Sequence, residues 1–190
     1  AGRGVASFLF FGRRGLGTRG SGSIDESDRI AARMIIGLIS DTHGLLRPEV
    51  AHVFAGVDRI LHAGDVGSHA VLEGLARIAP VEAVFGNVDD SHDPALARVR
   101  TLTCNGSVIH VSHGHELGRP TPELVLARYS ADVVVFGHTH RAVVLKTPDG
   151  RLAVNPGAAG PKRFNILASV ARLTLSGSRS QAQAEIIELG

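Results

Sequence analysis

Short apolar runs recur along the chain from Met34 onward, and more polar, helix-forming stretches separate them. Runs of this kind, rich in valine, isoleucine and leucine, are typical of strands that are covered on both faces of a sheet. They predict five strands before residue 137, at 34–40, 57–62, 81–85, 107–112 and 132–136.

The stretches between these runs predict three helices, at 47–55, 68–79 and 121–130. Each begins with a residue type found at helix starts: Pro48, Ser68 and the pair Thr121-Pro122.

After residue 136 the pattern changes to antiparallel strands. Strands at 142–147 and 151–154 flank Pro148-Asp149-Gly150, a hairpin turn, and two more are expected at 167–175 and 182–189. The alternation predicts an α/β fold, with one domain over 34–190 and no internal repeat.

The first 33 residues differ from the rest in composition and charge. They are rich in glycine and arginine and carry a net charge of +3, whereas the remaining 157 residues carry −1. We interpret 1–33 as a leader that is disordered or not native, with a processed targeting segment as the alternative. The basic pI of 9.2 therefore comes from the leader, so it does not indicate a nucleic-acid partner.

Other classes of protein are disfavoured by short sequence features. No apolar run approaches the ~18 residues of a membrane span, so we expect no membrane partner. The apolar run at 5–11 is short for a secretory signal and no small-residue cleavage site follows it, so we expect a cytoplasmic protein. Cys104 is the only cysteine, which excludes a disulfide framework and a cysteine-built metal site. Any metal site must therefore use carboxylates and some of the ten histidines.

Polar side chains follow each of the five predicted strands directly. The motifs are Asp41-Thr42-His43, Gly64-Asp65, Gly86-Asn87-Val88-Asp89, His113-Gly114-His115 and Gly137-His138-Thr139-His140. Ligands of open α/β sheets bind outside the carboxyl ends of the strands, so we expect these side chains to converge there. The spacing of His138 and His140 points both side chains the same way if the backbone is extended.

Imidazole, carboxylate and amide donors without a thiolate suit manganese, zinc, iron or nickel better than calcium. Seven candidate ligands exceed the four or so that one ion needs. Two divalent ions about 3.5–4 Å apart that share Asp65 would account for the surplus.

The ordered motifs resemble those of the calcineurin-like metallophosphoesterases. The short chain, Gly-Asn-x-Asp at 86–89 and Asn155-Pro156-Gly157 resemble a small phosphodiesterase branch that also contains the retromer subunit Vps29. The resemblance implies a four-layer α-β-β-α sandwich with mixed sheets.

The resemblance also implies a role for each motif residue. Asp41, His43, Asp65 and His140 would hold a first metal ion, and Asp65, Asn87, His113 and His138 a second. The expected ions are manganese, with zinc, iron or nickel as alternatives. A hydroxide that bridges the ions would attack the phosphorus of a small phosphodiester, with Asp65, Asn87 and His115 as the residues closest to the chemistry.

Val88 departs from the family pattern, in which many members have a histidine directly after the motif asparagine. Valine cannot assist a leaving group, so the proton must come from water or from a neighbour such as Asp89 or His115. This favours phosphodiesters over unactivated monoesters. His115 is equally well interpreted as a solvent-facing or supporting imidazole.

A protein-binding scaffold with a vestigial metal site, as in Vps29, is the alternative function that the resemblance implies. All seven ligand positions are filled here, which favours the enzyme. A nuclease is disfavoured by the near-neutral domain and by its few aromatic residues, four phenylalanines and Tyr129.

Overall fold

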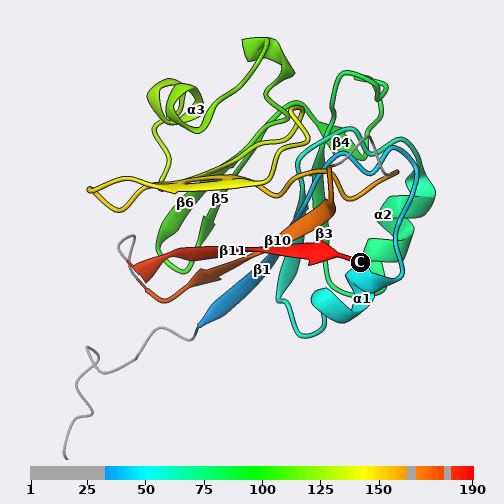
Figure 1. Ribbon diagram of the computed structural model, residues 1–190, viewed down its shortest axis with the longest axis horizontal. Helices are drawn as coiled ribbons and strands as arrows, with labels where there is room; N and C mark the ends of the chain where they lie inside the picture. Colours follow the sequence, from blue (N-terminus) through cyan, green and yellow to red (C-terminus); the bar gives the residue numbers. More distant parts are fainter. Residues whose placement is uncertain (1–32, 162–165, 178–180) are drawn as a thin grey trace, which may run out of the picture.

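The computed structural model describes residues 33–161, 166–177 and 181–190, which form two β-sheets with helices outside them (Figure 1). The strands are β1 Met34–Ile39, β2 Arg59–His62, β3 Val81–Val84, β4 Leu96–Ala97, β5 Arg100–Cys104, β6 Ser107–Val111, β7 Val133–Val135, β8 Val143–Lys146, β9 Leu152–Asn155, β10 Ala168–Leu175 and β11 Gln183–Leu189. The helices are α1 Glu49–Val53, α2 His69–Ala76, α3 Pro122–Arg128 and the 3-10 helix η2 His115–Leu117. The predicted leader, apart from Arg33, lies outside the described residues.

Both sheets contain a parallel centre with antiparallel strands beside it. The first sheet has the order β11-β10-β1-β2-β3-β4, in which β1 to β4 are parallel. The second sheet has the order β5-β6-β7-β9-β8, in which β6, β7 and β9 are parallel. Parallel neighbours end at the same edge, so each sheet collects the segments that follow its parallel strands at one edge.

The main apolar core lies between the two sheets. It contains Ile36, Leu38 and Leu61 from the first sheet and Val133 and Val135 from the second. Val134 points the other way, into the cluster beneath α3, because successive side chains of a strand face opposite sides. Burial on both faces explains why the strands have nearly continuous apolar sequences.

Helices cover the two outer faces, which gives the predicted four-layer α-β-β-α sandwich with mixed sheets (Figure 1). Phe54 after α1 and Leu75 of α2 pack with Ile60 on the outside of the first sheet. On the second sheet, Val125 of α3 packs with Val134. Within the described ranges, no helix combines the length and apolar character that a membrane span requires.

The helix predictions were right in position but too long. The structure has α1 over Glu49–Val53, α2 over His69–Ala76 and α3 over Pro122–Arg128. Thr121 caps α3, its hydroxyl oxygen accepting a hydrogen bond from the Leu124 N–H at 3.3 Å. Ser68 occupies the N-cap of α2 as predicted, although its side chain makes no capping hydrogen bond.

The strand predictions are confirmed in part. The five strands that precede the polar motifs do not form one open sheet, because β1 to β3 and β6 to β7 belong to different sheets. The predicted antiparallel pairing after residue 136 is found for β8 with β9 and for β10 with β11, and β9 also pairs in parallel with β7. Strands β4 and β5 were not predicted, although Asn105-Gly106, with φ of 48° and 79°, is the two-residue turn that joins β5 to β6.

Candidate metal centre

The loops after β1 and β2 are tied together along their backbones. The N–H of Asp41 donates to the Gly64 carbonyl and the N–H of His43 to the Asp65 carbonyl, each at 2.9 Å. This pairing places the carboxyl groups of Asp41 and Asp65 at the same sheet edge, where both are buried.

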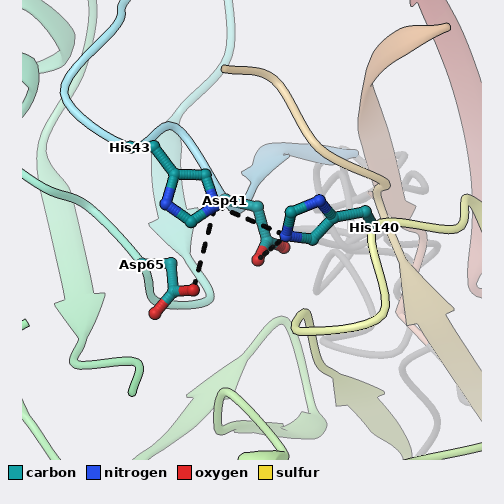
Figure 2. A group of neighbouring side chains, drawn as sticks. All are labelled: Asp41, His43, Asp65 and His140. Atoms are coloured by element: carbon teal, nitrogen blue, oxygen red, sulfur yellow. Dashed lines mark hydrogen bonds and ion pairs between the residues drawn. The ribbon is translucent and has the colours of Figure 1, made fainter. Parts of the chain in front are cut away.

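Asp41, His43, Asp65 and His140 form a first donor set (Figure 2). Each offers one ligand atom, and these atoms all lie within 4.8 Å of one another. The Nε2 atom of His140 lies 3.1 Å from Asp41 Oδ1 and 3.3 Å from His43 Nε2. His140 comes from the loop after β7, so the second sheet completes a set begun by the first.

Asp65, Asn87, His113 and His138 form a second donor set beside the first. The Oδ1 atom of Asn87 lies 3.2 Å from His113 Nε2 and 2.9 Å from His138 Nδ1. His113 Nε2 is also 3.4 Å from Asp65 Oδ1. Asp65 therefore belongs to both sets, its Oδ1 facing His113 and its Oδ2 facing His43 at 3.9 Å.

Backbone strain is concentrated at these residues. Six non-glycine residues in the described ranges have positive φ, and five of them are Asp41, His43, Asp65, His138 and His140. The condition under which His138 and His140 would point the same way, an extended backbone, is not met: their φ values are 67° and 58°. The bent chain sends the two imidazoles to different donor sets. Such strain is uncommon in non-glycine residues and clusters at functional sites.

The tautomer of His113 is fixed by its surroundings. Its Nδ1–H donates to the Ala63 carbonyl at 2.8 Å, and its Nε2 faces the centre, 3.4 Å from Asp65 Oδ1. Burial lowers the pKa of His113, but the contact with Asp65 and the charges of Asp41 and Asp65 outweigh it and raise the pKa. A backbone carbonyl that orients an imidazole in this way is the usual partner of a metal-binding histidine.

The ionisation and burial of Asp65 and Asp41 favour the binding of a cation. Burial raises the pKa of Asp65, but the contact and charge of His113, the Val88 N–H and the charge of His43 together lower it to about 2. Both oxygens of Asp41 are buried; among the described residues they accept no hydrogen bond, and Oδ1 has the ion-pair contact with His140 as its neighbour. Buried carboxylate oxygens without hydrogen bonds are costly unless a cation compensates them.

The donor spacing fits a metal ion. A tetrahedral ion with metal–nitrogen bonds of about 2.0–2.1 Å holds its ligand atoms about 3.3 Å apart. The separations of His140 Nε2 from Asp41 Oδ1 and from His43 Nε2, 3.1 and 3.3 Å, are close to this value. The residues present therefore fit a divalent metal.

His62 contacts the two loops that carry Asp41 and Asp65 and stabilises them. This imidazole is fully buried; its Nδ1 accepts a hydrogen bond from the Gly64 N–H at 3.2 Å, and its Nε2 lies 2.9 Å from Thr42 Oγ1. The Thr42 hydroxyl donates to the Val66 carbonyl at 2.9 Å. Burial lowers the pKa of His62 to about 4 despite the nearby carboxylates.

Asp89 and Asn155 hold two other loops. The carboxylate of Asp89 accepts hydrogen bonds from the N–H groups of Val66, Gly67 and Gly86 at 2.9–3.0 Å. Asn155 Nδ2 donates to the Gly137 carbonyl at 2.9 Å and to Thr139 Oγ1 at 3.0 Å, and its Oδ1 accepts from the Gly157 N–H. Asp89 thus supports the segment of Asn87, and Asn155 supports that of His138 and His140.

Comparison with known proteins identifies the family. Residues 34–178 match the model of the calcineurin-like phosphoesterase superfamily domain. The chain belongs to this superfamily. It is 35% identical over 167 residues to a probable metallophosphoesterase of Methanothermobacter thermautotrophicus, an alignment that covers 83% of this chain and 94% of that protein. It is 26% identical to Phosphodiesterase MJ0936 of Methanocaldococcus jannaschii, over 65% of this chain and 83% of that protein.

Solved structures support the fold of this superfamily member. Vacuolar protein sorting 29 from Cryptosporidium parvum matches with a TM-score of 0.68 and 22% identity, covering 83% of this chain and 98% of that one. The predicted resemblance to a branch that includes Vps29 is confirmed at the level of the fold.

His115 and Val88 lie beside the candidate metal centre. The His115 ring is 5.4 Å from the His113 ring and 6.3 Å from the His138 ring. Burial and the charge of His113 lower the pKa of His115, and its Nδ1 makes no hydrogen bond within the described residues. Val88 is 56% exposed, and its N–H donates to Asp65 Oδ1 at 3.1 Å.

The remaining histidines lie away from the two donor sets. His110 stacks on Tyr129 with 3.8 Å between ring centres, and His69 pairs with Asp93 at 2.6 Å. Sequence reasoning missed Thr42 as a supporting residue and Arg141 as a neighbour of the centre. Only their positions within or next to the Asp-x-His and His-x-His motifs could have indicated them.

Proposed function

We propose that this phosphoesterase is a metal-dependent phosphodiesterase that binds two divalent ions. One observation carries the proposal: two donor sets adjoin and share the carboxylate of Asp65. Asp41, His43 and His140 would complete the first site, and Asn87, His113 and His138 the second. A shared carboxylate is the usual arrangement for holding two ions close together.

When bound, such ions supply Lewis acidity toward the phosphoryl oxygens and lower the pKa of a coordinated water. The imidazole, carboxylate and amide donors suit manganese, which we take as the first choice, and also zinc, iron or nickel. The low pKa of Asp65 keeps its bridging carboxylate ionised at neutral pH, as metal ligation requires.

Hydrolysis adds the oxygen of water to phosphorus and breaks the bond to the leaving oxygen, which gains a proton. Val88 has no group that can donate this proton, and the oxygens of Asp89 already accept three backbone N–H groups. His115 lies beside His113 and His138, and its buried Nδ1 lies 4.0 Å from Glu116 Oε2, so Nε2 is the nitrogen that we expect to face a substrate. We assign His115 to contact the leaving group.

We expect a preference for diesters because the centre offers only a weak proton donor to the leaving oxygen. The lowered pKa of His115 makes it a neutral hydrogen-bond donor rather than a cationic acid at neutral pH. A phosphodiester carries one negative charge instead of two and is less repelled by Asp41 and Asp65. The likeness to a relative named a phosphodiesterase supports the same substrate class.

Hydrolysis of bis(4-nitrophenyl) phosphate tests the proposal, with manganese, zinc, iron and nickel added separately to chelator-treated protein. We expect release of 4-nitrophenolate that depends on metal. Asp65→Asn should reduce the rate at least about a hundredfold, because it weakens a ligand common to both ions. Glu73→Gln, an equal change of charge at an exposed position of α2, is the matched control.

Two results would count against the enzyme: a metal-loaded protein no faster than metal in buffer, or an Asp65→Asn variant as fast as the parent. The likeness to Vps29 then favours the second candidate, a scaffold whose fold serves protein binding. In that case metal would still raise the thermal stability of the parent without any turnover. The scaffold is contradicted if turnover is metal-dependent and is lost in Asp65→Asn.

A further inference from the structure

A groove lies beside the loop that carries His138 and His140. It has a volume of about 310 Å³, within the lower range of small-molecule sites. The loop before α3 contributes Arg119 and Pro120, and the segment that leads into β8 contributes Thr139, Arg141 and Val143. Its lining thus combines apolar surface with two guanidinium groups.

The two arginines have no partners among the described residues. Neither Arg119 nor Arg141 makes a hydrogen bond or ion pair there, both are exposed, and no acidic residue lines the groove. Other arginines are used structurally: Arg47 donates to the Gly160 carbonyl and Arg172 to the Val53 carbonyl. A pair of uncommitted guanidinium groups suits a carboxylate or phosphate, which arginine can bind with two parallel hydrogen bonds.

The groove lies next to the loop that carries His140, a proposed metal ligand. Thr139 and Arg141 flank His140, whose Nε2 lies 3.1 Å from Asp41 Oδ1. Successive Cα atoms are about 3.8 Å apart, so the groove begins one residue from a proposed metal ligand. The Thr139 side chain, which lines the groove, is held in place because Asn155 Nδ2 donates a hydrogen bond to Thr139 Oγ1 at 3.0 Å.

A second pocket, of about 210 Å³, borders the centre at Val88 and has the opposite charge. Asp89, Asp90 and Asp93 line it, and no lysine or arginine does. An additional negative charge on a substrate would be repelled there and attracted by the groove of Arg119 and Arg141. The two pockets therefore differ in the charge that they offer to a substrate.

We propose that the groove binds the non-leaving ester group of a phosphodiester, and that this group carries a second anion, a carboxylate or a phosphate. The proposal rests on the phosphodiesterase function argued above. His115 is assigned to the leaving group, so the groove next to His140 is available to the other ester group. Arg119 and Arg141 bind its anion, and the apolar wall contacts its carbon skeleton.

A matched pair of chromogenic diesters tests this subsite: 4-nitrophenyl phenyl phosphate and 4-nitrophenyl 4-carboxyphenyl phosphate. Both release 4-nitrophenolate and differ by one carboxylate on the retained group. After correction for the uncatalysed rates, we expect kcat/KM to be about tenfold higher for the carboxylated diester. In the double variant Arg119→Gln, Arg141→Gln this ratio should fall to about one. Arg77→Gln, at an exposed position just after α2, should keep the tenfold ratio.

The outcomes separate the subsite from the proposed function. If both diesters are hydrolysed with a ratio near one in the parent, or if the double variant keeps the parent's ratio, the subsite is wrong and the phosphodiesterase stands. If neither diester is hydrolysed, the phosphodiesterase is wrong. Calorimetric binding of 4-carboxyphenyl phosphate and phenyl phosphate to the manganese-treated protein then still tests the groove. Equal affinities in the parent would overturn it, whereas a preference lost in the double variant would support it.

Discussion

Acidification should destabilise this protein through one buried imidazole, that of His62. Burial lowers the pKa of His62 from 6.5 to about 4, so the folded protein resists protonation at a pH where the unfolded chain accepts it. A group of this kind contributes its full stability above pH 6.5, and this contribution is lost as the pH falls toward 4. The pH window is therefore fixed by the two pKa values.

The magnitude follows from the same values. Each pKa unit corresponds to about 1.4 kcal/mol, so the difference between 6.5 and about 4 is worth at most about 3 kcal/mol. Between pH 7 and pH 5 about 2 kcal/mol of this should be lost from the free energy of unfolding. This is a large part of the 5–15 kcal/mol that typically stabilises a domain.

Urea unfolding at pH 7, 6 and 5, in the presence of a chelator, measures the effect. The parent should lose about 2 kcal/mol more than His62→Gln over this range, because glutamine does not titrate. His52→Gln removes an exposed histidine and should behave like the parent. His62→Asn, which keeps an acceptor near the Gly64 N–H, is a second variant if the glutamine protein does not fold. Equal pH dependence in the parent and both His62 variants would refute the assignment.

Other contacts around the centre give three further predictions. Gly86→Ala would place a Cβ against Asp65, so we expect a loss of about 1–3 kcal/mol in urea unfolding together with weaker metal binding in calorimetry. Asp89→Asn should cost about 1.5–3 kcal/mol in the same unfolding assay, because the carboxylate accepts three backbone N–H groups, whereas exposed Asp90→Asn should change little; equal losses would contradict this. A metal at 100 times its dissociation constant should stabilise the parent by about 2.7 kcal/mol, and Asn155→Ala should require more metal for the same rise in melting temperature.

The strands that carry the proposed ligands could be predicted because their burial leaves a simple pattern. Val133, Val134 and Val135 are apolar in succession since one face meets the other sheet and the other face meets α3. The division into two sheets could not be derived from that pattern, because a buried parallel strand has the same apolar sequence pattern in either sheet. The resemblance to a known family provided the four-layer arrangement.

The positions of the site residues were easier to predict than their conformations. A polar residue directly after a buried strand has few places to lie, so the convergence of Asp41 and His113 followed from the order of the strands. The residue types of His138-Thr139-His140 do not indicate a left-handed backbone, because that conformation depends on contacts from distant segments. Asn155, 16 residues from Thr139, makes one of these contacts.

The distribution of strain also bears on whether the centre binds metal. Left-handed φ at residues such as Asp41, His43 and Asp65 costs about 1 kcal/mol or more each, and such conformations persist only where the surroundings enforce them. Buried carboxylate oxygens of Asp41 without hydrogen bonds add a further cost. A surface that serves only to bind another protein gains nothing from these features, since the strained residues turn their side chains toward one another rather than outward. A cation held between them would offset both costs, so the same strain that weakens the fold favours a centre that binds metal.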